Sequence, residues 1–222
     1  MKVTFLQHQD SLPPGKLGEY LVARQGAVTK VLQTHEVRED HEDVVSADLL
    51  VSLGHPLSVY RTDVEWVARE RRIIAERLAR GAPVLGICFG AQMIASLSGG
   101  SSTEIGRSYI GWWSNNEVAA PVWRGPWFRF HREQCLHPAA QVLARSEGVI
   151  QAFTCGNAIG VQFHPEMDAA IAAELAPAMQ RDFDLTPDDT RKLIEETRVK
   201  VEEMKATREA LFDEVLRLFR GI

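Results

Sequence analysis

One abrupt strand-to-helix junction restricts the possible folds of this chain more than any other feature. Val84–Ile87 is an apolar run typical of a buried strand, and Gly90–Leu97 follows with a helical pattern. Cys88 lies at the junction, flanked two residues away by Gly86 and Gly90. So tight a turn strains its central residue, and a Cβ on either flank would collide with neighbouring backbone. We therefore predict an α/β fold with the Cys88 thiol at a helix N-terminus, where free N–H groups and the helix dipole favour the thiolate.

The first half of the chain alternates between strand-like and helix-like segments. The strand-like segments are short and almost continuously apolar, whereas the helix-like segments are amphipathic. We predict strands at Val3–Gln7, Val28–Gln33 and Asp48–Leu53, and helices at Lys16–Gln25 and Glu65–Arg80. This rhythm indicates a mostly parallel sheet with helices on both faces, which is a three-layer α/β/α arrangement.

A different pattern follows from residue 102 to residue 163. Short alternating strands are expected there, with turns at Gly106, Gly111, Gly125-Pro126 and Gly156-Asn157. We predict an antiparallel extension of the sheet, with strands near Val142–Ala144, Val149–Thr154 and Ala158–Phe163.

The C-terminal tail, about residues 168–222, has a helical pattern. Asp168–Met179 is expected to form one helix, and Thr186-Pro187 begins another, with threonine at the N-cap and proline in the first turn. No glycine or proline interrupts the tail from there to Arg220. An apolar stripe favours packing of this tail on the chain's own sheet over docking to a partner; it consists of Met204, Leu211, Val215 and Leu218. The length of 222 residues fits a single domain, residues 1–222, that includes the tail.

Composition excludes several classes of function. The net charge of −5 and the lack of a Lys/Arg cluster argue against a nucleic-acid surface. We expect no membrane segment, because no apolar run is long enough, and no signal peptide, because the chain starts directly with a strand. Three cysteines, an odd number, favour the reducing cytoplasm. The histidines lack metal-ligand spacing and no nucleotide-binding fingerprint occurs, so neither a metal nor a cofactor is expected.

Candidate partners for Cys88 lie in the run Phe163-His164-Pro165-Glu166. His164 and Glu166 are two residues apart, so in an extended segment both side chains point to the same side. Pro165 favours such an extended conformation for His164. A cysteine nucleophile, a histidine base and a carboxylate that orients the base make a site for covalent acyl transfer.

The chain resembles the class I glutamine amidotransferases in these two motifs, Gly86–Gln92 and Phe163–Glu166. Further similarity lies in Phe5–His8, Leu53–Val59 and Phe128–His131, and it extends over roughly residues 1–170. Within that family the chain looks most like single-domain proteins similar to the glutaminase part of GMP synthase. The resemblance implies a flavodoxin-like fold and an enzyme that hydrolyses the γ-carboxamide of glutamine.

The resemblance also implies roles for individual residues. Cys88, His164 and Glu166 would form the catalytic triad, and Gln92 would hold the substrate glutamine. Donors for the oxyanion would be the N–H of Phe89 and the loop Gly54-His55-Pro56, in which relatives usually carry Gly-Gly-Pro. His55 therefore either holds this loop in a non-productive conformation or simply fits its geometry.

Three functions remain open on the sequence. The first is an amidotransferase subunit that forms a cysteine thioester and delivers ammonia to a separate synthetase. The second is a stand-alone hydrolase of γ-glutamyl amides or peptides. The third is a regulatory module whose triad is idle because the oxyanion loop is altered at His55.

Overall fold

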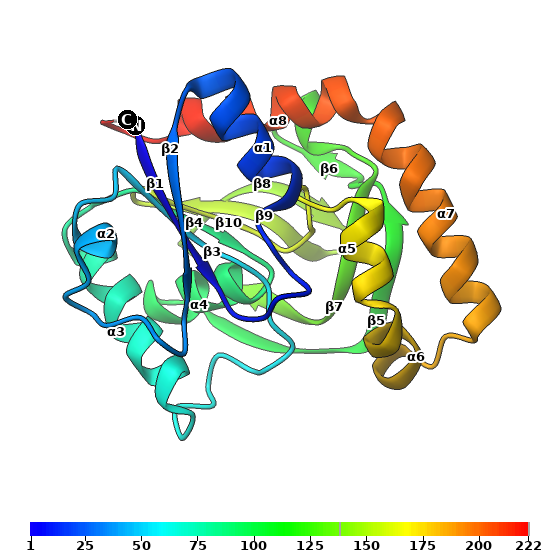
Figure 1. Cartoon of the computed structure of the whole chain (residues 1–222), viewed down its shortest axis with the longest axis horizontal. Coiled ribbons are helices and arrows are strands. Elements are labelled where there is room, and N and C mark those ends of the chain that lie inside the picture. Colours follow the sequence, from blue (N-terminus) through cyan, green and yellow to red (C-terminus); the bar gives the residue numbers. More distant parts are fainter. Residues whose placement is uncertain (138, 222) are drawn as a thin grey trace.

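The computed structural model describes residues 1–137 and 139–221, and its strands form one large sheet (Figure 1). The parallel part of this sheet contains, in spatial order, β2 (Val28–Gln33), β1 (Lys2–Gln7), β3 (Leu49–Ser52), β4 (Val84–Ile87) and β10 (Ala158–Val161). Every residue of β3, β4 and β10 is buried, as expected for strands with helices on both faces. The predicted strands of the first half are confirmed to within a residue at each end.

The antiparallel part begins at β10, which pairs in parallel with β4 and antiparallel with β9 (Val149–Cys155). Beyond β9 lie β7 (Trp127–Leu136) and β5 (Ser101–Trp113), while β8 (Gln141–Ser146) pairs with both β9 and β6 (Glu117–Val118). The predicted antiparallel extension is therefore present.

The expected turns at Gly106 and Gly111 are wrong, because both glycines lie inside the long strand β5. Both have positive φ, 78° and 91°, and the β5–β7 register shifts between Glu104 and Tyr109. Glycines with positive φ occur at β-bulges as well as in turns, and a bulge leaves the strand continuous. In this chain the two glycines mark an irregular strand and not the ends of strands.

Helices cover both faces of the sheet (Figure 1). One face packs against α1 (Gly15–Gln25), α8 (Lys205–Leu218) and the short 3₁₀ helix η1 (Pro121–Trp123). The other face packs against α2 (Glu42–Val45), α3 (Glu65–Ala79) and α4 (Phe89–Leu97). Neighbouring β1 residues divide between the two cores, with Phe5 in the first and Leu6 in the second. The three-layer α/β/α prediction is thus confirmed.

The tail contains four helices in the described residues, not the two that the sequence suggests. They are α5 (Ala169–Glu174), α6 (Ala176–Phe183), α7 (Pro187–Glu203) and α8. The expected single helix over Asp168–Met179 breaks at Leu175, because Pro177 lies in the first turn of α6 and has no N–H to continue the ladder.

The second break, at Met204 between α7 and α8, has no proline or glycine to signal it. Here a side chain replaces the lost backbone contact, since Arg208 Nη1 donates to the Val201 carbonyl at 2.8 Å. Burial of Met204 in the core shared with α1 and β1 favours the kinked path.

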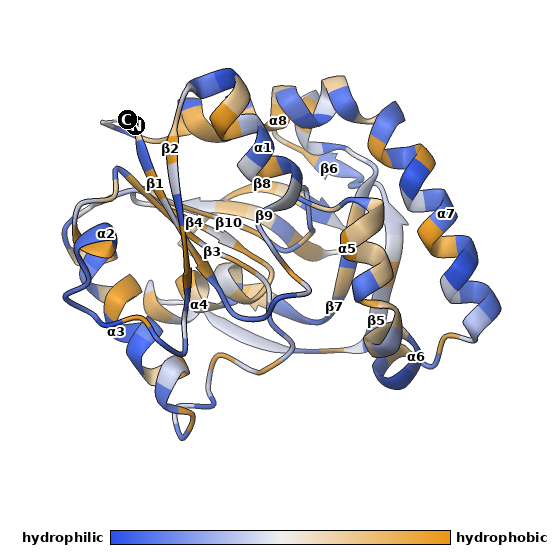
Figure 2. Ribbon diagram, in the orientation of Figure 1, coloured by the Kyte–Doolittle hydropathy of each residue, from blue (hydrophilic) through white to orange (hydrophobic). Residues whose placement is uncertain are grey.

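The apolar stripe of the tail packs on the chain's own core, as predicted. Leu211 and Val215 are buried in the same cluster as the strands, and Leu218 is partly buried against it. Figure 2 shows the orange central strands and the largely blue outer side of α7. Within the described residues, no helix has both the length and the apolar character required to cross a bilayer.

A matched pair of valines tests this packing. Val215 is 4% exposed, whereas Val199 on α7 is 49% exposed. We expect Val215→Ala to lower the free energy of unfolding by roughly 1–3 kcal/mol and Val199→Ala to change it by less than about 0.5 kcal/mol. Urea unfolding of both variants measures the difference, and equal effects would contradict the packing of α8.

Candidate active site

Backbone crowding fixes the turn that carries Cys88. Its backbone has φ 52° and ψ −101°, and its N–H donates to the Val161 carbonyl of β10 at 2.8 Å. A Cβ added to Gly86 would lie 2.3 Å from the Gly90 backbone, and one added to Gly90 would lie 2.3 Å from the Ser52 carbonyl oxygen. The predicted need for glycine on both flanks is confirmed, and the thiol stands at the N-cap of α4.

His164 and Glu166 meet through a hydrogen bond of 2.7 Å between Nδ1 and Oε1, and both side chains are 1% exposed. His164 itself forms an antiparallel β-bridge with Phe128, as its expected extended conformation requires, but the expectation that the extended segment continues to Glu166 is wrong. The Met167 N–H donates to the His164 carbonyl, so residues 164–167 form a turn with Pro165 at its second position, where proline is favoured. The turn brings the carboxylate back to the imidazole.

Elements far apart in the sequence hold this turn in place. The His164 N–H donates to the Phe128 carbonyl of β7 at 2.8 Å. The Glu166 carbonyl accepts from Lys16 N–H, at the first turn of α1, at 2.9 Å. A Cβ on Gly15 would lie 2.2 Å from that carbonyl oxygen, so the glycine allows α1 to approach Glu166 closely.

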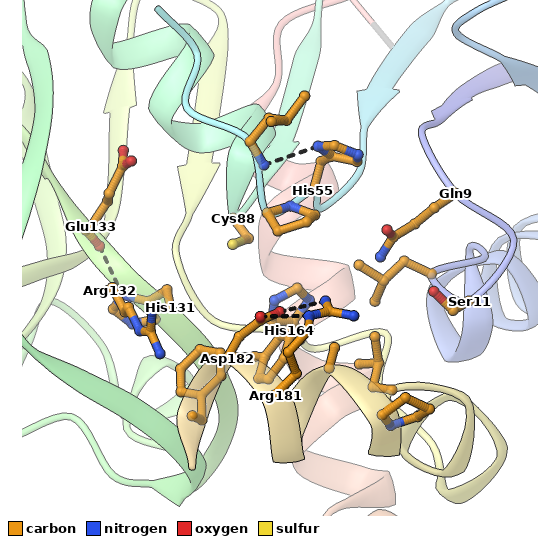
Figure 3. A pocket seen from close by; sticks show the side chains of 18 of the residues that line it. Gln9, Ser11, His55, Cys88, His131, Arg132, Glu133, His164, Arg181 and Asp182 are labelled. Atoms are coloured by element: carbon orange, nitrogen blue, oxygen red, sulfur yellow. Dashed lines mark hydrogen bonds and ion pairs between the residues drawn. The ribbon is translucent and has the colours of Figure 1, made fainter. Parts of the chain in front are cut away.

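The environment of His164 favours a charged imidazolium. Burial alone would lower its pKa, but the charge of the Glu166 carboxylate and the adjacent Cys88 sulfur outweigh that effect and raise the pKa to about 10. Nε2 makes no hydrogen bond to another of the described residues, and Cys88 lies near enough to the ring to contribute to its raised pKa. Figure 3 shows the thiol and the ring at one cavity.

The loop after β3 lies against both side chains. A Cβ on Gly54 would come within 2.9 Å of His164 Cε1 and 3.7 Å of Cys88 Cβ, so only glycine fits there. His55 does not have positive φ. Its Nδ1 accepts from the Leu57 N–H at 3.0 Å.

His55 is neutral in this loop. Its ring packs against Trp66 and Phe89, with ring centroids 4.9 and 5.9 Å away. Burial, with a contribution from His8, lowers the pKa of His55 to about 4. The side chain therefore fits the loop as a turn cap and an aromatic contact, which favours the second of the two alternatives considered for His55.

Two backbone donors near Cys88 are free. Among the described residues, neither the His55 N–H nor the Phe89 N–H donates a hydrogen bond outside regular helix pairing. Phe89 is the first residue of α4, where N–H groups have no intrahelical acceptor.

A cavity of about 620 Å³ opens over Cys88 and His164. The loop with His55 forms one side and α6 forms the other, with Arg181 and Asp182 paired at 2.7 Å on that helix (Figure 3). The sequence gives no signal for the part that α6 plays in the cavity, because the residues of α6 carry no motif and the helix starts at an unpredicted break at Leu175.

Gln92, the expected substrate-binding residue, and His131 also line this cavity. Gln92 is 5% exposed, and its Nε2 lies 3.5 Å from Gln162 Oε1. His131 is buried and stacked on Tyr109, and its Nδ1 donates to the Glu133 carbonyl at 2.8 Å. Burial lowers the pKa of His131 to about 3, so this ring is neutral.

The remaining cysteines and tryptophans lie elsewhere. Cys135 is buried, which raises the pKa of its thiol, and neither it nor Cys155 lines the cavity. Trp123 and Trp127 belong to the core beside α8, whereas Trp112 packs against α5–α7. In residues 1–137 and 139–221, no group of three or more His, Cys, Asp or Glu side chains is arranged to hold a metal ion.

Comparison with known proteins gives consistent matches. The family profile described as glutamine amidotransferase class-I matches residues 16–174. A GMP synthase (glutamine-hydrolyzing) from Aeropyrum pernix is 32% identical over 174 residues, covering 68% of this chain and 31% of that protein. An anthranilate synthase component 2 from Archaeoglobus fulgidus is 35% identical over 114 residues, covering 46% of this chain and 61% of that protein. The chain thus spans less than two thirds of each relative.

Solved structures share the fold over nearly the whole chain. A glutamine amidotransferase from Thermotoga maritima has a TM-score of 0.85 at 24% identity, covering 98% of this chain and 97% of that chain. A second, from Methylobacillus flagellatus, has a TM-score of 0.84 at 22% identity, covering 99% and 95% respectively. At these identities the likeness establishes the architecture alone.

The charge on His164 gives a pH prediction. Since its pKa lies above the ordinary 6.5, the charged ring stabilises the fold fully below about pH 6.5, and this contribution declines as the pH rises toward 10. Glu166→Gln removes the largest raising influence, so His164 should lose its proton at clearly lower pH. NMR titration of the imidazole nitrogens measures this, and an unchanged titration would contradict the assigned cause.

Proposed function

The chain belongs to the class-I glutamine amidotransferase family, and we propose that it hydrolyses the γ-carboxamide of glutamine through a thioester on Cys88. The observation that carries this proposal is the strained Cys88 turn beside a buried His164–Glu166 pair at the floor of one cavity. A thiol at a helix N-terminus next to an imidazolium has the surroundings that produce a nucleophilic thiolate.

In the proposed reaction, the Cys88 sulfur attacks the γ-carbonyl carbon and forms a tetrahedral oxyanion. His164, as imidazolium, gives a proton to the leaving nitrogen, and ammonia departs with formation of the γ-glutamyl thioester. The neutral imidazole then takes a proton from water, which attacks the thioester and releases glutamate. Glu166 orients the ring and stabilises its charged form.

The oxyanion requires donors that are in place before the reaction. The free N–H groups of Phe89 and His55 are the best candidates, because both lie beside Cys88 and have no other acceptor in the described residues. Each such donor typically lowers the barrier by about 3 kcal/mol. We assign Gln92, which lines the cavity one helical turn after Cys88, to binding of the substrate.

We further propose that the ammonia serves a separate synthetase. The relatives support this, since one is a GMP synthase of which the match covers 31% and another is a component of anthranilate synthase. Residues 1–222 would act as a single domain, because the tail helices share a core with the strands. The three free thiols suit a reducing compartment such as the cytoplasm.

The size of the cavity favours a second candidate, the hydrolysis of larger γ-glutamyl amides or peptides. At about 620 Å³, it exceeds what a single amino acid needs and has the Arg181–Asp182 pair on its wall. Glutamine and γ-glutamyl peptides should therefore be compared by kcat/KM. An increase in glutamine turnover with an added synthetase would favour the first function, and no turnover of any substrate would indicate an idle module.

Replacement of the nucleophile tests the reaction directly. Cys88→Ala and Cys88→Ser should abolish glutamate release while the fold stays intact, because the Cys88 sulfur is the atom that forms the thioester in the proposed reaction. Cys155→Ser is the matched control and should retain full activity, since Cys155 lies outside the cavity. Near-native turnover by either Cys88 variant would refute the mechanism.

The loop geometry gives a prediction for His55→Gly. The substitution removes the cap on the Leu57 N–H and the aromatic contacts, so the loop should become less ordered. We expect kcat to fall, with little change in KM, because a mispositioned oxyanion donor weakens binding of the transition state. A rise in kcat would show that the His55 side chain restrains the loop in a less active conformation.

A further inference from the structure

A second buried network lies directly behind the proposed oxyanion loop. His8, at the end of β1, places Nε2 2.7 Å from Glu70 Oε2 on α3, and both side chains are 0% exposed. The other carboxylate oxygen of Glu70 accepts from the Ser52 hydroxyl at 2.6 Å. His8 Nδ1 lies 3.2 Å from the Gly54 carbonyl oxygen. The sequence signal for this network is Glu70, a carboxylate on the apolar inner side of a helix.

The hydrogen bonds fix how many protons this network holds. A carbonyl oxygen and an ionised carboxylate are both acceptors only. His8 must therefore donate from Nδ1 to Gly54, and the Nε2–Glu70 contact must hold one more proton, either on the ring or on the carboxyl. In both arrangements the Gly54 carbonyl accepts from His8.

The Gly54 carbonyl is chemically linked to a proposed oxyanion donor. In a trans peptide the C=O and the following N–H point in opposite directions. A carbonyl held toward His8 therefore turns the His55 N–H away from His8. The same peptide lies against the reacting groups, since a Cβ on Gly54 would be 3.7 Å from Cys88 Cβ and 2.9 Å from His164 Cε1.

We propose that His8, oriented by Glu70 and Ser52, is a positioning residue that holds the Gly54–His55 peptide with its N–H ready to receive the oxyanion. The network also contacts the turn that carries Cys88, because Gly90 in that turn packs on Ser52. A Cβ added to Gly90 would lie 2.7 Å from Ser52 Oγ. This inference rests on the proposed glutaminase reaction. It adds three residues, His8, Ser52 and Glu70, that are not among the described residues lining the cavity.

Burial of the His8–Glu70 pair carries a desolvation penalty, so stability alone is a poor explanation for it. A carboxylate and an imidazole without solvent contact give little net stability compared with apolar side chains of similar size. Their effect here is directional, because the pair fixes the orientation of one ring and, through it, one peptide plane.

Two substitutions of His8 separate positioning from stability. An asparagine amide nitrogen occupies roughly the place of Nδ1, and a glutamine amide nitrogen roughly that of Nε2. His8→Gln keeps a partner for Glu70 but loses the bond to Gly54, so kcat should fall roughly 10- to 100-fold with KM nearly unchanged. His8→Asn keeps the bond to Gly54 but leaves the Ser52 hydroxyl as the remaining partner of the buried Glu70 carboxylate, so it should be less stable and yet retain the higher kcat.

A purely structural role predicts the reverse order of kcat, with His8→Gln above His8→Asn, and that result would overturn the proposal. Glu76→Gln is the matched control, because it removes an exposed carboxylate from the same helix, and it should leave kcat unchanged. Alkylation of Cys88 by iodoacetamide forms no oxyanion, so its rate should be equal in wild type and His8→Gln. A parallel loss of alkylation would show general damage to the site and also count against the proposal.

One measurement needs neither activity nor a folded variant. In isotope-labelled wild-type protein, NMR should detect a coupling across the hydrogen bond between His8 Nδ1 and the Gly54 carbonyl carbon. Absence of that coupling would refute the positioning role even if the enzyme is active. Conversely, a coupling in a protein that hydrolyses no γ-glutamyl compound would contradict the proposed function while leaving the network intact.

Discussion

The close approach of three backbones at the Cys88 turn is the constraint on which the rest of the structure depends. Strand β4 can enter helix α4 this sharply only because Gly86 and Gly90 have no Cβ, and Gly90 then packs directly on Ser52 of β3. The strain at Cys88, with φ 52°, is maintained by the bond from its N–H to Val161 of β10. Backbone contacts within the parallel sheet thus set the position of the Cys88 thiol, independently of the other side chains of the site.

The three histidine rings that line the cavity around this turn differ in charge. His164 is held as a cation by Glu166 and Cys88, whereas burial keeps His55 and His131 neutral. One charged ring thus lies beside the thiol and two uncharged rings lie on the cavity walls, which suits the proposed role of His164 as the proton donor. His8 is not among the residues that line the cavity, and its proposed role is to orient the Gly54–His55 peptide through the Gly54 carbonyl.

The sequence predicted the parts of the fold that depend on local pattern. The strand–turn–helix at Cys88, the alternating elements before it and the cap at Thr186 are all local signals, and the structure contains each of them. The break at Met204 and the continuity of β5 through Gly106 could not be predicted, because packing and bulge geometry decide them. For the same reason the sequence did not place α6 over the cavity or bring Glu70 to His8, since both contacts join distant elements.

The central claim is that Cys88 carries the γ-glutamyl group between release of ammonia and release of glutamate. It is tested most directly by acid-quenching the protein during turnover of glutamine and mapping its peptides by mass spectrometry. The account predicts a γ-glutamyl adduct on Cys88 that disappears when the substrate is exhausted, with none on Cys135 or Cys155. Steady glutamate release with no adduct, or with the adduct on another residue, would contradict it.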